Sequence, residues 1–218
     1  TQRIYVVGSF DEGDDYDTDA GKVAATQYER DVYGIGYGFR FGDHAIDVNV
    51  HRMQTEDTGT PSLPMDIDWF DTDIWNVSYR NESGPVNLEL RLYGSSIDHG
   101  MSNFRLRPAP DFSSLPLPPF VGDDKRNVLT DSREQGFKLT LDTEVGGGVL
   151  VAGIESKDAN HDASVFDPDF APFFVNNFAD SETASRAVFA QWSSLRGQRW
   201  YFELGARLEN YQSETGEV

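Results

Sequence analysis

The chain has 218 residues, which is enough for one large domain or two small ones. Its 18 Lys and Arg residues face 37 Asp and Glu residues, and the net charge of −19 excludes the basic surface that binding to nucleic acid or anionic lipid requires. Cysteine is absent, so the chain has no disulfide, zinc-thiolate site or thiol nucleophile. Aromatic residues make up 13% of the chain, which argues against disorder.

Period-two alternation of apolar and polar residues is the main structural signal, and it predicts β-strands. In the first such segment every second residue is aromatic or branched, with glycines between them. Later segments place Val, Leu and Trp opposite Asn, Glu and Arg. In chain order the alternating segments are 33–41, 46–51, 75–80, 86–93, 137–142 and 200–209.

Connections of two lengths alternate along the whole chain. Short turns are expected near 42–43, 81–84, 146–148 and 196–199, and long polar loops near 11–26, 54–70, 96–132 and 158–184. A transmembrane β-barrel has this arrangement, with short periplasmic turns, long extracellular loops and strands of alternating polarity. The sequence therefore predicts an all-β fold: about nine antiparallel strands of a larger transmembrane β-barrel. A soluble β-sandwich is the alternative, because alternating strands alone are a weak signal.

The two ends of the chain suggest a piece of a longer protein. The first ten residues already alternate like the middle of a strand, and the last six read as a polar loop. Nine strands do not close a bacterial barrel, which has an even strand number. No apolar run approaches the roughly 18 residues of a membrane-spanning helix.

Several stretches resemble the TonB-dependent outer-membrane receptors. Residues 186–192 and 200–209 are similar to paired strands that are common in that barrel, whereas 25–31, 59–67 and 98–107 resemble its copper-receptor branch. The resemblance implies that residues 1–218 are part of a single receptor barrel domain in the bacterial outer membrane, in contact with its lipid. Members of that family have a 22-stranded barrel filled by an N-terminal plug domain, and they draw energy from the TonB complex. The plug domain is not included in this chain.

His99 and Met101 are the candidate metal ligands. Residues i and i+2 of a strand share a face, so the imidazole and the thioether point the same way, and this pair of donors favours copper. Extending the alternation of Glu89, Arg91 and Tyr93 places both side chains on the lumenal face. The resemblance implies the same two residues as ligands of a transported copper ion, completed by sulfur side chains on the plug. As an alternative, both are ordinary residues of the long 96–132 loop.

Other polar residues give weaker signals. Two acidic runs, 11–19 and 66–73, could offer oxygen ligands to Ca²⁺, but neither matches the EF-hand spacing, and solvated loops are the preferred interpretation. Met53 and Met65 could extend a methionine path for copper, whereas His44, His51 and His161 are expected to be structural or exposed. No catalytic triad or metal-hydrolase motif is recognisable, so we do not expect an enzyme.

Three functions remain open at this point. The first is a copper-transporting TonB-dependent receptor, and the second is a receptor of the same kind for a siderophore or another ligand. The third is a soluble β-sandwich that binds sugar or calcium. A plug-domain sequence upstream of this chain would distinguish the first two from the third.

Overall fold

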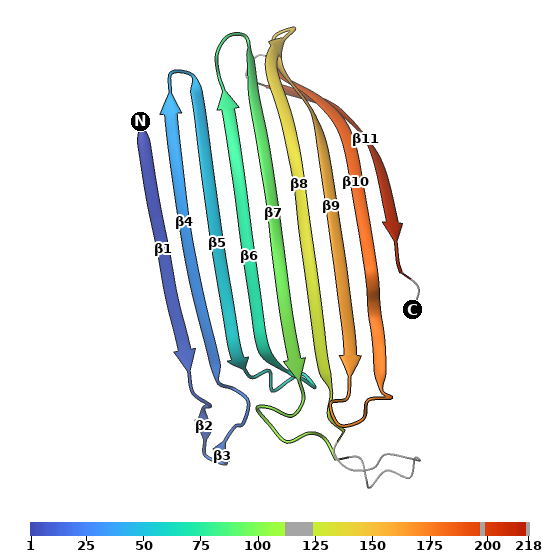
Figure 1. Ribbon diagram of the computed structural model, residues 1–218. Helices are drawn as coiled ribbons and strands as arrows, with labels where there is room; N and C mark the ends of the chain where they lie inside the picture. Colours follow the sequence, from blue (N-terminus) through green and yellow to red (C-terminus); the bar gives the residue numbers. More distant parts are fainter. Residues whose placement is uncertain (112–123, 197–198, 217–218) are drawn as a thin grey trace.

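The computed structural model describes residues 1–111, 124–196 and 199–216. Nine long strands form one antiparallel sheet (Figure 1), and two short strands, β2 (Asp17–Thr18) and β3 (Gly21–Lys22), pair within the first connection. In the described part of the chain, no helix is long and apolar enough to cross a membrane. The long strands are β1 (Gln2–Gly13), β4 (Tyr28–Phe41), β5 (His44–Thr58), β6 (Asp66–Asn81), β7 (Val86–Ser102), β8 (Asn127–Val145), β9 (Gly148–Phe166), β10 (Phe174–Arg196) and β11 (Trp200–Glu214).

Each long strand pairs with its neighbours along the chain, in the order β1-β4-β5-β6-β7-β8-β9-β10-β11. This up-and-down sheet confirms the predicted fold class, a partial antiparallel β-barrel wall. A β-sandwich needs two large sheets packed face to face. Among the described residues there is one large sheet, so the sandwich alternative is not supported.

The short turns at 42–43, 82–85 and 146–147 lie at one end of the sheet and the long connections at the other, as the sequence predicts (Figure 1). The turn predicted near 196–199 lies partly outside the described residues. Gly146 and Gly147 both have positive φ, of 61° and 71°, which a two-residue turn between β8 and β9 requires. We call these ends the short-turn end and the long-loop end.

The first long loop has nearly its predicted length, at 14–27, but the other three were predicted too long. The strands continue well into the segments expected as loops, which leaves connections at 59–65, 103–126 and 167–173, with 112–123 outside the described residues. The reason is that the strand ends carry polar residues on both faces. Aspartate, serine and arginine interrupt the apolar half of the alternation there, although the backbone ladder continues.

One face of the sheet carries a continuous apolar belt. Its central row runs directly across eight strands, and the residues in this row face one another pairwise: Phe39, Ile46, Tyr79, Leu90, Leu139, Ile154, Val188 and Leu208. Many belt side chains are exposed, with Leu204 at 75% and Val188 at 50%. The buried apolar residues of the described chain are only alanines. An apolar surface of this extent, uncovered by protein, fits contact with lipid.

The opposite face is polar and ionic. Asp47 forms ion pairs with Arg3 at 2.7 Å and Arg80 at 3.1 Å, and Lys157 pairs with Glu134 at 3.1 Å. A hollow of about 570 Å³ on this face is lined in part by Arg91, Tyr93, Lys138 and Glu155. The two faces therefore have the polarity of the outer and inner sides of a barrel wall.

Candidate metal site

His99 and Met101 lie in strand β7, near its long-loop end. The pairing of β7 with β8 runs without interruption from Val86 to Ser102, so the alternation of side chains is preserved along the whole strand. Both residues therefore share the polar face with Tyr93. The structure places the pair in a strand, which removes the alternative that both belong to a loop.

His99 is half-buried between neighbouring strands. Its ring lies against Phe70 of β6, with 4.6 Å between ring centroids, and Thr130 lies opposite on β8. Its Nε2 atom is buried, and no described residue forms a hydrogen bond with it. His99 lies beyond the apolar belt, and burial lowers the pKa of its imidazole, which favours the neutral form that can donate to a metal.

Met101 lies where a bulge in β6 interrupts the pairing between β6 and β7. It faces Ile67 of β6 and Val128 of β8. Asp68 is an extra residue in β6, because Ile67 faces Met101 whereas Trp69 already faces Gly100. This bulge puts Ile67, rather than a charged residue, beside the thioether.

Two arginines of the 103–126 connection hold the adjoining loops against β6. Arg107 pairs with the fully buried Asp66 at 2.9 Å and also donates to the carbonyl of Leu63 at 2.6 Å. Arg105 pairs with Asp57 of β5 at 2.8 Å. The loops around the pair are therefore tied to the sheet by buried and half-buried charges.

His99 and Met101 offer two donor atoms, which are fewer than a complete coordination sphere needs. In the described ranges no group of three or more His, Asp and Glu side chains is arranged to hold a metal ion.

Asp15, in the first acidic run, has a structural role, because its carboxylate accepts hydrogen bonds from the backbone N–H groups of Thr26 and Gln27 at 2.8 and 2.9 Å. These two hydrogen bonds lower the pKa of the Asp15 carboxyl, and the bond from Thr26 has the larger effect.

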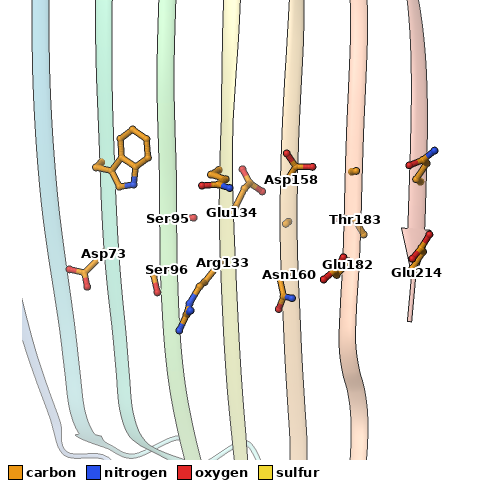
Figure 2. A pocket seen from close by; sticks show the side chains of 15 residues that line it. Asp73, Ser95, Ser96, Arg133, Glu134, Asp158, Asn160, Glu182, Thr183 and Glu214 are labelled. Atoms are coloured by element: carbon orange, nitrogen blue, oxygen red, sulfur yellow. The ribbon is translucent and has the colours of Figure 1, made fainter. Parts of the chain in front are cut away.

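A large hollow toward the long-loop end lies away from His99 and Met101, and no sequence pattern predicted it. It has a volume of about 690 Å³ and extends across β6 to β11, with Asp73, Arg133, Asp158, Asn160 and Glu182 among its walls (Figure 2). These residues occupy the same side of their strands as the apolar belt. They come from four different strands, β6, β8, β9 and β10, so the strand register brings them together.

The fold and the two faces define a class, the wall of a membrane-spanning β-barrel. No family model matches the sequence, and no curated protein matches it. A solved structure described as "Copper transporter OprC" is similar to it, with a TM-score of 0.80 and 19% sequence identity. The match covers 98% of this chain and 34% of that chain, so this chain spans about a third of the length of its structural relative. At this identity the likeness shows the fold.

That relative is described as a transporter. The likeness covers nearly all of the nine-stranded sheet.

Proposed function

We propose that this chain is part of the barrel of a TonB-dependent transporter in the bacterial outer membrane, and that copper is its cargo. Residues 1–218 then belong to one barrel domain. A plug domain and the TonB complex act with it through the full-length protein. The short-turn end faces the periplasm, the long-loop end faces the outside, and the polar face lines the lumen.

The observation that carries the proposal is the shared position of His99 and Met101 on the polar face of β7. A thioether beside a neutral imidazole selects copper over the hard cations magnesium and calcium. The likeness to a solved copper transporter supports the same cargo. The unpartnered Nε2 of His99 also supports it, because a buried nitrogen without a partner costs free energy unless a ligand occupies it.

Two donors are too few for tight binding, so the remaining ligands must come from a part of the protein that faces the lumen. We infer that these are sulfur side chains on the plug. The 690 Å³ hollow is excluded as the cargo site, since it lies on the side of the belt.

The test is metal analysis of the full-length receptor purified after growth with copper. Replacing His99 by Ala and Met101 by Leu should remove the copper ion held by this pair, whereas barrel assembly, followed by heat-modifiable gel mobility, should not change. His161→Ala is the matched control, because His161 is also on the polar face and bonds to Ser132 at 2.7 Å. Copper retained at wild-type stoichiometry by an assembled double variant would refute the ligand assignment.

A further inference from the structure

A second His-x-Met pair, His51 and Met53, lies on β5. The chain has four histidines and three methionines. Two histidines and two methionines form pairs with the same i, i+2 spacing on one sheet. His51 faces Ile74 of β6 and Met53 faces Thr72, and both belong to the polar face. The pair on β5 lies nearer the short-turn end than the pair on β7, because Thr72 faces Ile97, which precedes His99.

A chain of hydrogen bonds fixes the tautomer of His51. The Tyr5 hydroxyl donates to Oδ1 of Asn49 at 2.7 Å, and Nδ2 of Asn49 donates to Asn76 at 3.0 Å. Because the proton of Tyr5 is used in this way, its oxygen accepts from Nε2 of His51, 3.2 Å away. In the neutral imidazole this arrangement leaves the lone pair on Nδ1 of His51, in the way that outer-shell partners orient metal-binding histidines.

The backbone of β4 leaves room beside that nitrogen. Gly34 faces His51 across the ladder, and a Cβ atom on Gly34 would lie only 2.5 Å from Nδ1. Any other residue at position 34 would displace the imidazole. The glycine therefore gives His51 its position over β4.

The polar face between the two pairs contains unsatisfied polar atoms. Thr72 lies on β6, opposite Met53 and diagonally adjacent to His99. It is 5% exposed, and its Oγ1 atom has no hydrogen-bond partner among the described residues. Nε2 of His99 is unsatisfied as well. Of the three buried side-chain atoms without a partner in the described ranges, two thus lie on the strip that joins the pairs.

We propose that His51 and Met53 form a second station for Cu(I), which receives the ion from His99 and Met101 on its way toward the periplasm. This inference rests on the proposed function. The step is a ligand exchange without change of oxidation state: the bonds to one imidazole and thioether break as bonds to the next pair form. A neutral imidazole and a thioether suit Cu(I), and a site with few donors releases its ion readily, as passage requires.

The experiment measures binding of Cu(I) to the full-length receptor in detergent under reducing conditions, by equilibrium dialysis over a rising concentration of Cu(I). Ag(I) serves as a redox-inert second probe. We expect one more ion per wild-type receptor than per His51→Ala/Met53→Leu variant, and copper uptake by cells at least fivefold slower in this variant. Arg52→Ala/Gln54→Ala is the matched control, because these neighbours on β5 occupy the other face and should leave both readouts unchanged.

Each result decides between the two proposals. Unchanged stoichiometry and uptake in an assembled His51→Ala/Met53→Leu receptor would overturn the second station and leave the proposed function standing. Loss of an ion in that variant, with none lost after His99→Ala/Met101→Leu, would instead overturn the ligands proposed on β7. Met53→Leu alone nearly preserves side-chain volume, so it gives the same decision if the double variant fails to assemble.

Discussion

The two halves of each long strand have the same backbone pairing and different chemistry. In the short-turn half of β7, the outward positions are Leu88, Leu90 and Leu92, whereas further along they are Ser96 and Asp98. The neighbouring strands change in the same way, since Leu139 of β8 gives way to Arg133 and Asp131. Alternation therefore marks the membrane only where one of the two faces is apolar. Beyond the belt the strand persists because its register is already set.

A row of aspartates shows most clearly how the long-loop half of the strands differs from the short-turn half. Asp71, Asp98, Asp131 and Asp162 lie directly opposite one another across four adjacent strands, on the side of the belt. Arg52 approaches Asp71 at 3.4 Å and Arg133 approaches Asp131 at 3.4 Å, so only part of this charge is balanced. Four carboxylates cannot face hydrocarbon, and the bilayer must end between the belt and this row.

The largest expected effect is an all-or-none difference in accessibility between the two ends. An epitope inserted between Pro61 and Ser62, which are exposed in the 59–65 loop, should be labelled on intact cells. One inserted between Gly146 and Gly147 should be labelled only after the outer membrane is permeabilised. Labelling at the glycine turn of intact cells would reverse the proposed orientation.

The next largest effect is a difference in the stability cost of a charged substitution between the two halves of β7. Leu90→Arg places a charge in the central row of the belt and should cost about 2–4 kcal/mol of barrel stability, because a cation near the bilayer midplane is poorly solvated. Asp98→Arg, on the same side of β7, should cost nothing measurable. Urea unfolding of the full-length receptor in liposomes, followed by gel mobility, measures both. Equal losses would mean that the belt is not the lipid-facing surface.

The sequence predicted most of the fold, because the belt and its alternation are local signals. Leu88, Leu90 and Leu92 identify β7 directly, and Gly42 and Gly147 identify turns. It failed at the strand ends, where Asp98 and Asp131 look like loop residues. The placement of His99 and Met101 on the polar face was confirmed, but their role as ligands stays a prediction. The pairing of His51 with Met53 was missed, since His51 was expected to be structural or exposed and its neighbours Tyr5 and Gly34 come from other strands.

A smaller effect is expected where the loops are tied to the long-loop half. Asp66 is fully buried and accepts hydrogen bonds from Arg107 at 3.0 Å and from the Thr60 N–H at 2.8 Å. Asp66→Ala should lower the free energy of local opening by about 1.5–3 kcal/mol, because charged hydrogen bonds are lost at a buried position. Faster amide exchange in 59–65 and 103–111 would report it.

Asp57→Ala is the control for the buried ion pair between Asp66 and Arg107. Asp57 pairs with Arg105 at the surface, where both side chains are nearly half exposed, and such pairs contribute about 0–1 kcal/mol. Equal exchange rates in the Asp66 and Asp57 variants would show that burial of the first pair does not stabilise the loops.

The smallest effect concerns the aspartate row itself. Asp98 faces Asp71 on one side and Asp131 on the other, and like charges directly opposite in a sheet destabilise it. Asp98→Asn keeps the shape of the side chain and removes one charge from the middle of the row, so it should stabilise the receptor by roughly 0.2–1 kcal/mol in urea unfolding. Asp131→Asn should act similarly, and the double variant should gain less than the sum, because either change relieves the same repulsion. The gain should shrink in high salt, which screens exposed charges. A loss of stability on removing Asp98 would instead mean that a bound cation neutralises the row, and the long-loop half would then owe part of its stability to that ion.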